Sequence, residues 1–425
     1  MLGFDRKEAK SAESEYTPPV LQVLILDDES MVVDTLAVWL RMPGVHLTTC
    51  LEIEAAEALL STFRFDVVVT DLSVSELGGL EGMRLIRFVT THFPDTTVYV
   101  LSGYVDESVR SLCSVLGVTA VLEKPEGLSQ LRTLLLEHRA SQANGAVITG
   151  DGEVQQVERL EDFLQADTIR SVLQPVIKLK DGGAPFEVFG AEGLARGTTG
   201  SALGNPSFLL AYAARKELLF EADMICIRAA LHEVSVLGHP LITFLNVQPR
   251  SLTNPELTTK LCSAVAAAGL EEKSIVLELT EQQTIVNPRA FAATLQKLRD
   301  RGFRIALDDF GEGSSNLNLF QDLRPDYLKI SGTFCRNLAH DPFKQIIVQS
   351  TAEMAARAGT ATIMEAVETA EEAEVLRRLG IDYAQGYFFL KPLPGRDLAR
   401  VLEEGPVRSS RSGAVGAVGL LPSAS

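Results

Sequence analysis

The sequence contains no uninterrupted apolar run of about 18 residues, the length that a membrane-spanning helix requires. Its opening stretch, MLGFDRKEAKSAESE, also lacks the apolar core of a signal peptide. Cysteine is scarce: five cysteines are scattered along the chain, with no CxxC pair and no histidine at a zinc spacing. These absences predict a cytoplasmic protein without membrane insertion, whose cysteines act as buried small hydrophobic residues.

Basic residues are also in deficit, which leaves a formal net charge of -17 at pH 7. Such acidity disfavours nonspecific attachment to nucleic acid, because the phosphates would be repelled. No basic helix-turn-helix segment remains once the domains below are assigned, so we expect no DNA partner. The 46% hydrophobic and 22% charged residues are typical of globular proteins, and 425 residues are enough for two or three domains.

Residues 18–142 alternate short apolar runs with amphipathic stretches, which is typical of strands and helices in turn. The apolar runs are VLIL, VVV, VYVL and VTAVL, at 23–26, 67–69, 98–101 and 118–122. This α/β pattern predicts one doubly wound domain with a five-stranded parallel sheet.

Residues 143–157 lose this periodicity in favour of glycine and polar residues, and we expect a linker there. A second alternation of strands and helices covers residues 158–405, and its strand candidates are VLQPVIKL, EVFGAEGLA, LITFLNV, SIVLELT, FRIALDD, DYLKIS, TATIMEAV and YAQGYFF. Eight strands separated by helices in about 250 residues predict a (β/α)8 barrel of the TIM type. The Ser- and Gly-rich tail at 406–425 is expected to be disordered.

Polar residues follow the predicted strands of the first domain. Asp27 and Asp28 follow the first strand, Asp71 the third, Ser102 the fourth and Lys124 the fifth. Because the carboxyl ends of the strands form the site in an open α/β sheet, we expect these side chains to meet in a small Mg²⁺ site. Asp71 would be the nucleophile, Lys124 would offset phosphoryl charge, and Ser102 would donate a hydrogen bond to the phosphoryl group. A lone acid at a strand end is often a helix cap, but five coordinated positions weaken that interpretation.

The first domain resembles the response-regulator receiver family through LILDDE, VVVTDLSVSELGGLE, VLSGY and EKP. The resemblance implies that a cognate histidine kinase phosphorylates Asp71. Two positions depart from the family: Ser75 replaces a common proline, and Val121 replaces an aromatic residue. That aromatic residue normally rotates inward upon phosphorylation, so we expect an unusual transmission of the signal.

Polar residues also close seven consecutive strands of the second domain: Glu192, Asn246, Glu278, Asp308 with Asp309, Lys329, Glu365 and Gln385. Residues at the carboxyl ends of barrel strands converge even when they are distant in sequence. Several carboxylates and an amide oxygen at one mouth favour Mg²⁺ or Mn²⁺, and the adjacent Asp308 and Asp309 suggest two ions that share a carboxylate. Such a centre can activate water and stabilise both the attacking and the leaving oxygen of a phosphodiester.

Other polar groups would complete this site. Lys329 would hold or orient the water, Glu365 would be the general base or a positioning acid, and Arg196 would bind a substrate phosphate. Each residue alone has a simpler explanation; Asn246, for example, would hold a turn before VQP. The joint pattern over seven strands favours a functional site.

Residues 158–404 resemble the EAL-domain phosphodiesterases through LQPVIKL, AEGLAR, FLNV, LELTE, LDDFGEG, PDYLKI, MEAVET and AQGYFFLKPLP. The resemblance implies hydrolysis of cyclic di-GMP to linear pGpG, and a homo-oligomer formed through the barrel. It implies these metal ligands: Glu192, Asn246, Glu278, Asp308 and Asp309. The other catalytic positions that match are Lys329, Glu365, Gln385, Glu368 and Glu281, the last as anchor of the loop after strand five. The substrate-binding positions that match are Gln174, Leu194 and Arg196.

The second domain departs from this family at a few positions. Gly193 replaces the usual alanine, which should have little effect because that side chain is not a ligand. Glu312 stands where threonine is common, Ser314 where an aromatic residue is common, and Ser331 where aspartate is common after Lys-Ile. We expect the extra acid at 312 to alter ion affinity or to hold its loop differently.

Two hypotheses follow. The first is a response regulator whose barrel hydrolyses cyclic di-GMP under the control of Asp71 phosphorylation. The second is a catalytically weak barrel that binds cyclic di-GMP or a partner protein and acts as a regulator. Degenerate barrels normally lose a metal-binding acid and none is missing here, which favours the enzyme. A synthase is disfavoured because no GGDEF-type sequence occurs, and GGLEG at 78–82 belongs to the receiver.

Overall fold

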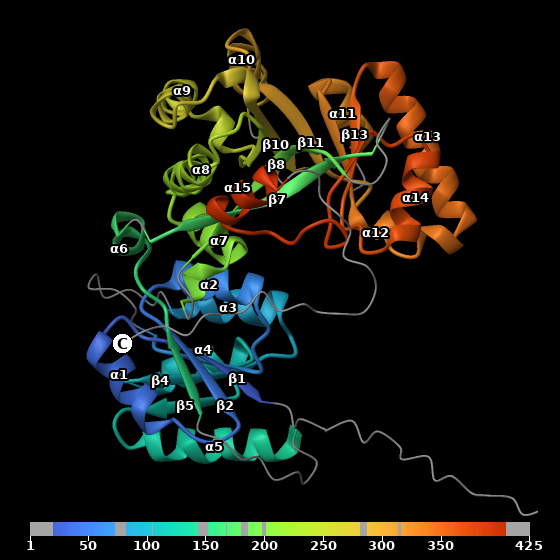
Figure 1. The fold of residues 1–425 in the computed structure, drawn as a ribbon. Helices are drawn as coiled ribbons and strands as arrows, with labels where there is room; N and C mark the ends of the chain where they lie inside the picture. Colours follow the sequence, from blue (N-terminus) through green and yellow to red (C-terminus); the bar gives the residue numbers. More distant parts are fainter. Residues whose placement is uncertain are drawn as a thin grey trace, which may run out of the picture. The chain divides into compact units, whose positions relative to one another are not determined.

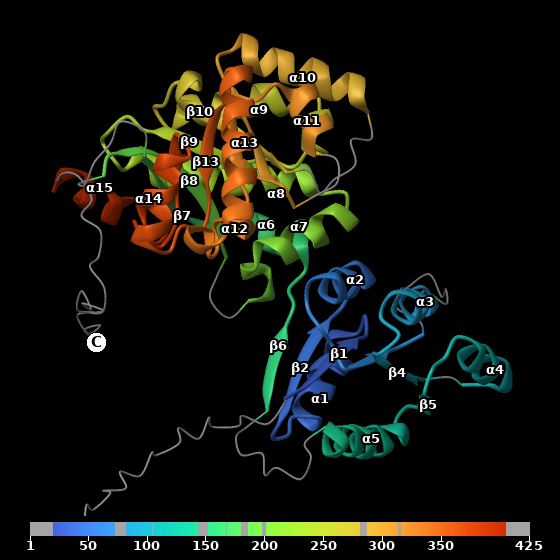
Figure 2. The same cartoon turned by 90° about the vertical axis from the view of Figure 1, so that its right-hand side faces the viewer.

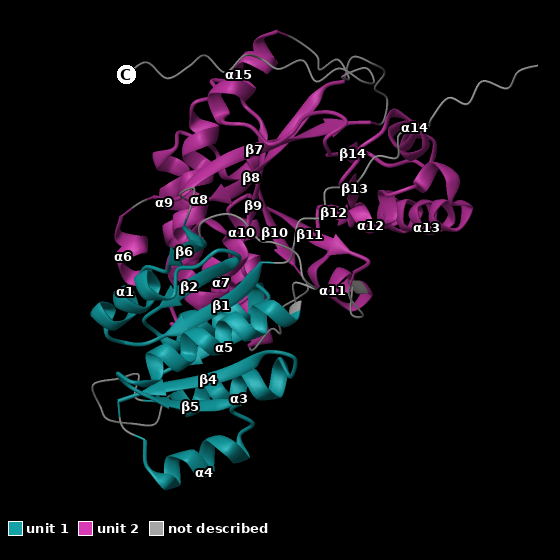
Figure 3. Cartoon of the chain, turned by 90° about the horizontal axis from the view of Figure 1, so that it is seen from below, with its two compact units in different colours: residues 1–160, 200–202 teal, residues 161–199, 203–425 magenta. Residues whose placement is uncertain are grey.

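The computed structural model describes residues 20–72, 82–103, 105–142, 152–166, 168–179, 186–197, 201–280, 287–312 and 316–404. The chain divides into two compact units, residues 1–160 with 200–202, and residues 161–199 with 203–425 (Figure 3). The predicted tail at 406–425 and residues 143–151 of the predicted linker lie outside the described residues. No helix within the described ranges is long and apolar enough to cross a membrane.

The first unit is a parallel sheet with helices on both faces (Figure 2). Its strands are β1 (Leu21–Leu26), β2 (Val45–Cys50), β3 (Val67–Thr70), β4 (Thr97–Ser102), β5 (Ala120–Glu123) and β6 (Glu153–Gln156). Its helices are α1 (Ser30–Trp39), α2 (Ile53–Thr62), α3 (Gly82–His92), α4 (Glu107–Val115) and α5 (Gly127–Gln142). The strands lie in the order β5-β4-β3-β1-β2-β6, and every neighbouring pair is parallel.

Burial on both faces explains why these strands are continuous apolar runs rather than alternating ones. On one face, Val23 of β1 packs in a cluster with Leu36 of α1 and Leu131 of α5. Helices α2 and α3 lie side by side on the other face (Figure 2). The predicted doubly wound domain is therefore confirmed.

The sheet has a sixth strand, so the predicted number of five is wrong. Strand β6 falls in the segment that we expected to be a linker, and it pairs in parallel with β2 from His46↔Glu153 to Thr49↔Gln156. The backbone N–H of Val157 continues the ladder by donating to the carbonyl oxygen of Thr49 over 2.8 Å. Most of β6 is exposed, so its sequence carries no apolar signal of a strand.

The second unit is a closed eight-stranded barrel (Figure 1). Its strands are β7 (Arg170–Lys178), β8 (Val188–Arg196), β9 (Ile242–Asn246), β10 (Ile275–Thr280), β11 (Arg304–Phe310), β12 (Tyr327–Ile330), β13 (Ala361–Met364) and β14 (Tyr383–Ala384). Its helices are α6 (Leu160–Gln165), α7 (Pro206–Arg215), α8 (Leu219–Ser235), α9 (Leu257–Ala267), α10 (Pro288–Asp300), α11 (Asn316–Leu323), α12 (Gly332–Cys335), α13 (Pro342–Ala358), α14 (Ala370–Arg378) and α15 (Gly395–Glu403). All eight predicted strands are present.

The barrel departs from a regular (β/α)8 barrel in its first strand. Strand β7 runs antiparallel to both of its neighbours, β8 and β14, whereas the remaining neighbours are parallel. An antiparallel pair needs only a short connection, and no helix separates β7 from β8 in the described residues. The predicted barrel is therefore confirmed, with β7 as the one antiparallel strand among its described strands.

Apolar side chains fill one layer of the barrel interior. This cluster contains Val176, Phe244, Val276, Ala306, Tyr327 and Ile363, each from a different strand. A second cluster lies between the barrel wall and helices α8, α9 and α10, where Leu277 of β10 packs with Leu261 and Leu295. The interior layer forms a rigid floor, and the next inward-facing residues of the strands lie directly above it.

Candidate functional site

The predicted polar residues lie above this apolar floor because side chains alternate along a strand. Two residues after Phe244, Val276, Ala306, Tyr327 and Ile363 of the floor come Asn246, Glu278, Asp308, Lys329 and Glu365. With a period of two, each polar residue shares the inward face of its apolar neighbour. Glu192 in the middle of β8 and Gln385 directly after β14 complete the ring.

Lys329 is the centre of this ring, and its side chain is only 1% exposed. Its Nζ lies 3.2 Å from Glu192 Oε2, 3.0 Å from Glu278 Oε1, 2.9 Å from Asp308 Oδ1 and 3.0 Å from Glu365 Oε1. These carboxylates come from different parts of the barrel wall. The structure therefore brings four of the predicted carboxylates together around the ammonium group of Lys329.

Amide side chains link the carboxylates to one another. Asn246 Nδ2 donates to Glu192 Oε1 at 3.0 Å. Gln385 Nε2 donates to Glu192 Oε2 at 2.9 Å and to Glu365 Oε1 at 3.2 Å. The buried Oε1 of Gln385 has no hydrogen-bond partner within the described residues, so an acceptor oxygen is available for a cation or a water.

Negative charge is in excess in this ring, and the carboxyl pKa values respond to it. Burial, together with the charge of Glu192, raises the pKa of Glu278 well above its usual value. Burial and the neighbouring acids raise the pKa of Glu365 to about 8. Burial, with Asp308 beside it, also raises the pKa of Asp309 to about 6. The folded protein holds these carboxylates together at a cost that a bound cation would relieve.

Glu192 and Lys329 respond in the opposite direction. Burial acts to raise the pKa of Glu192, but Lys329 and the two amide donors outweigh it, so this pKa is lowered. Burial acts to lower the pKa of Lys329, but the surrounding carboxylates raise it well above its usual value. Both groups are therefore charged at neutral pH.

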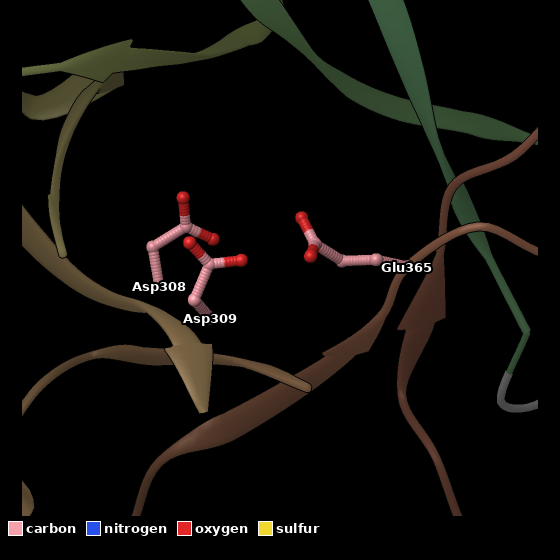
Figure 4. A group of neighbouring side chains, drawn as sticks. All are labelled: Asp308, Asp309 and Glu365. Atoms are coloured by element: carbon pink, nitrogen blue, oxygen red, sulfur yellow. The ribbon is translucent and has the colours of Figure 1, made fainter. Parts of the chain in front are cut away.

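Asp308, Asp309 and Glu365 form the part of the ring that opens toward solvent. One oxygen from each lies within 4.8 Å of the others. Figure 4 shows the two aspartates at the end of β11 facing Glu365, which follows β13. Hard divalent cations prefer such oxygen donors, so the donor set fits Mg²⁺ or Mn²⁺.

A pocket adjoins the ring on the side of β8. Its lining includes Leu194, Arg196, Asn246 and Asp223. Arg196 is exposed, and Nη1 donates to the carbonyl oxygen of Ala195 at 2.8 Å. Leu194 and Arg196, which were predicted to bind substrate, thus line one pocket, and Asn246 of the ring lines the same pocket.

Gln174 lies on the neighbouring strand β7, where it is paired directly with Glu192 of β8 and is half-buried. Because β7 is antiparallel, this contact comes from the middle of the strand rather than from its carboxyl end. Glu368 is exposed and lines a hollow with Asp309 and Glu365, so it lies at the rim rather than inside the ring. Glu281, Ser75 and Ser314 lie outside the described residues.

Sequence reasoning missed Asp223. This residue of α8 is 3% exposed, and burial raises its pKa to about 7. Its Oδ2 accepts a hydrogen bond from the backbone N–H of Gln248 at 3.0 Å. The sequence did contain a signal for it. Asp223 interrupts the apolar face of a buried helix, since Phe220 and Ile227 lie one turn to either side, and a buried acid usually has a specific role.

The first unit brings its predicted residues together as well. Lys124 Nζ lies 2.6 Å from Asp27 Oδ2 and 2.7 Å from Asp71 Oδ2. Ser102 is buried at the end of the adjacent strand β4, and Asp28 is half-buried after β1. Burial and the charge of Asp71 raise the pKa of Asp28, and burial raises that of Asp27 in spite of Lys124. This pocket also has more acids than bases.

A doubly wound sheet with an acidic pocket, followed in the same chain by a barrel with an acidic mouth, defines a two-domain response regulator. The chain belongs to the EAL domain family, whose sequence profile matches residues 157–392. The profile of the response regulator receiver domain matches residues 23–136. Both predicted family memberships are thereby confirmed.

Several known proteins are similar to this chain. The cyclic di-GMP phosphodiesterase RocR of Pseudomonas aeruginosa is 28% identical over 391 residues, which cover 88% of this chain and 96% of RocR. The cyclic di-GMP phosphodiesterase PdeF of Escherichia coli is 32% identical over 166 residues, but these cover only 39% of this chain and 22% of PdeF. The solved structure "PaMucR Phosphodiesterase, c-di-GMP complex" is 26% identical with a TM-score of 0.50, and the match covers 56% of this chain and 97% of that one.

Replacing Lys329 tests the charge balance of the ring. Lys329→Met leaves buried carboxylates without their ammonium partner, which typically costs about 3–5 kcal/mol. We expect the Tm of the variant in EDTA to fall by several degrees, and Mn²⁺ to restore much more stability to the variant than to the wild type. Thermal unfolding followed by fluorescence measures both values.

The control for this experiment is Lys297→Met, which removes an exposed lysine from α10. Its Tm should stay close to that of the wild type with and without Mn²⁺. Equal losses of stability for Lys329→Met in EDTA and in Mn²⁺ would contradict the idea that cations and Lys329 neutralise the same charges.

Proposed function

We propose that this chain is a response regulator whose barrel hydrolyses cyclic di-GMP to linear pGpG in a reaction that depends on divalent cations. The observation that carries the proposal is the complete ring around Lys329, in which no metal-binding position has been replaced by a non-ligand. The similarity to RocR, which extends over both domains, supports it.

The ring separates into groups that would hold cations and groups that would act on water or substrate. We assign the first role to Glu192, Asn246, Glu278, Asp308 and Asp309. When bound there, Mg²⁺ or Mn²⁺ would lower the pKa of a water molecule and stabilise charge on the phosphodiester oxygens. The excess of carboxylates over ammonium groups supports this assignment, because cations would offset it.

Glu365 is the group that we assign to accept the proton of the attacking water. Its carboxylate lies at the open part of the ring and is positioned by Lys329 and Gln385. The water oxygen would bond to phosphorus, the bond to the 3′ oxygen would break, and that oxygen would take up a proton to become a hydroxyl, while the 5′ phosphate would remain on pGpG.

The pocket beside the ring would hold one guanylate half of the substrate. Arg196 is placed to bind a phosphate oxygen, and a guanidinium group suits that contact. Asp223 supplies a carboxylate, and the Watson–Crick edge of guanine presents N–H donors. We therefore assign Asp223 to the recognition of a guanine base.

The assay of this function follows pGpG formation from cyclic di-GMP by chromatography. Glu192→Gln removes a carboxylate ligand without changing side-chain size. We expect at least a hundredfold loss of kcat, since replacing even a residue that only hydrogen-bonds to a metal ligand typically lowers metal affinity or activity by about 10–100-fold. EDTA should abolish the wild-type reaction, and Mn²⁺ or Mg²⁺ should restore it.

Glu187→Gln is the matched control, because it makes the same chemical change at an exposed residue just before β8. It should retain wild-type kcat. Nucleotide binding without any turnover in the wild type would instead favour the second hypothesis, a catalytically weak barrel that acts as a cyclic di-GMP receptor.

Asp223→Asn tests base recognition. The amide retains an acceptor for the N–H of Gln248 but loses the charge that would pair with guanine, and charge-assisted hydrogen bonds contribute about 1.5–3 kcal/mol. We expect KM to rise by about tenfold or more with kcat changed by less than about threefold. The exposed Asp300→Asn serves as control, and unchanged KM in Asp223→Asn would remove this residue from the substrate site.

The receiver would control the barrel through phosphorylation of Asp71 by a histidine kinase, with one Mg²⁺ held by Asp27, Asp28 and Asp71. Lys124 contacts Asp71 and is placed to offset the added negative charge. A change in domain packing, or in the pairing of two barrels within a homo-oligomer, would carry the signal to the barrel.

Asp71→Asn should prevent this control. Incubation with acetyl phosphate and Mg²⁺ should add one phosphoryl group to the wild type, seen by intact mass, and none to the variant. Basal hydrolysis should be retained, while any response of hydrolysis to acetyl phosphate should disappear. The exposed Asp95→Asn is the control, and a phosphoryl group still added to Asp71→Asn would refute the assignment.

A further inference from the structure

Two positions at which the barrel differs from its family meet in space. Glu312 lies in the loop after β11 and Ser331 follows β12, so they are 19 positions apart in sequence. The Oγ of Ser331 donates to Glu312 Oε1 at 2.5 Å. Ser331 is only 2% exposed, and its oxygen also accepts a hydrogen bond from the N–H of Thr333 as N-cap of α12. The single hydroxyl proton and an oxygen lone pair of Ser331 therefore both have partners.

This contact lies at a turn that places Asp309 in the ring. Asp309 has φ of 55°, and Gly311 two residues later has φ of 106°. A left-handed conformation is unfavourable for a residue other than glycine and persists only when its surroundings enforce it. In this conformation, one carboxylate oxygen of Asp309 lies within 4.8 Å of one from Asp308 and one from Glu365.

Three contacts hold the turn against the start of α12. The N–H of Ser331 donates to the carbonyl oxygen of Phe310 at 3.2 Å. A Cβ on Gly311 would lie 2.2 Å from the ring of Phe334, so the glycine backbone packs directly on that ring. The third contact is the bond between Ser331 and Glu312, which joins the turn and α12 through side chains alone.

We propose that the Glu312–Ser331 hydrogen bond is a tether that holds the turn so that Asp309 is positioned for cation binding. The family commonly has threonine at the first position and aspartate at the second. This chain has a carboxylate first and a hydroxyl second, so the two chemical groups have exchanged places. The two departures then compensate for each other, and Glu312 is a positioning residue. This inference rests on the proposed phosphodiesterase function.

A double-mutant cycle tests the tether. Glu312→Thr removes the acceptor, Ser331→Asp removes the donor but retains an N-cap, and the double variant restores a hydroxyl and a carboxylate in exchanged positions. We expect each single variant to lose about tenfold in kcat and to need several-fold more Mn²⁺ for half-maximal activity, with KM for cyclic di-GMP little changed. The double variant should recover to within about threefold of the wild type on both measures.

Glu312→Gln separates the tether from direct cation binding. The amide oxygen can still accept from Ser331, so this variant should keep the Mn²⁺ requirement of the wild type. A large increase in that requirement would make Glu312 a ligand and overturn the tether. Glu353→Thr, at an exposed site on α13, is the control for the effect of replacing a glutamate.

The Tm of the four proteins in EDTA gives a readout that does not need catalysis. The Tm of the double variant should be higher than the value obtained by adding the two single-variant shifts to the Tm of the wild type. Additive shifts, or coupled shifts with an unchanged Mn²⁺ requirement in every variant, would refute a positioning role. If the wild type itself hydrolyses no cyclic di-GMP, the proposed function fails, whereas the Tm cycle still reports on the tether.

Discussion

The barrel site depends on one constraint, the burial of a single ammonium group among carboxylates. Lys329 contacts Glu192, Glu278, Asp308 and Glu365, and its side chain is 1% exposed. Burying a charge is expensive unless it is paired, so Lys329 requires acids around it. One lysine cannot neutralise all of them, however. Burial raises the pKa values of Glu278 and Glu365, and the charge imbalance raises them further. Divalent cations would remove it, so the stability of the folded barrel and its proposed catalysis depend on the same charges.

The fold supplies this arrangement through side-chain alternation rather than through any local motif. The polar residues lie two positions after members of the apolar floor, such as Tyr327 before Lys329 and Val276 before Glu278. The floor fixes the height of the ring, since the apolar residues cannot turn toward solvent without exposing a large area. A one-residue shift of a strand would move its ligand out of the barrel. The precision of the site is thus a consequence of core packing.

The sequence was sufficient to predict both folds and most of the ring, because apolar runs that end in polar residues are a strong local signal. It failed where the structure depends on pairing between distant segments. The direction of β7 is set by its neighbours β8 and β14, and β6 is held by the backbone of β2 with little apolar burial. The packing role of Gly193 was not predicted from the sequence either. A Cβ at this position would lie 2.5 Å from that of Ala230, so only glycine fits there without a shift.

The two domains use the same physical arrangement with different access to solvent. In the receiver, the side chain of Lys124 is 20% exposed and joins two strand-end acids, whereas Lys329 in the barrel is enclosed. Under the proposed phosphorylation, a partly exposed Lys124 could change its partners as a phosphoryl group is added to Asp71 and lost. The enclosed ammonium group of Lys329 contacts four carboxylates at once, which suits oxygen donors that must keep one geometry during the proposed catalysis. Exposure of the central lysine therefore distinguishes the proposed switching site from the proposed catalytic one, although both place a lysine among carboxylates.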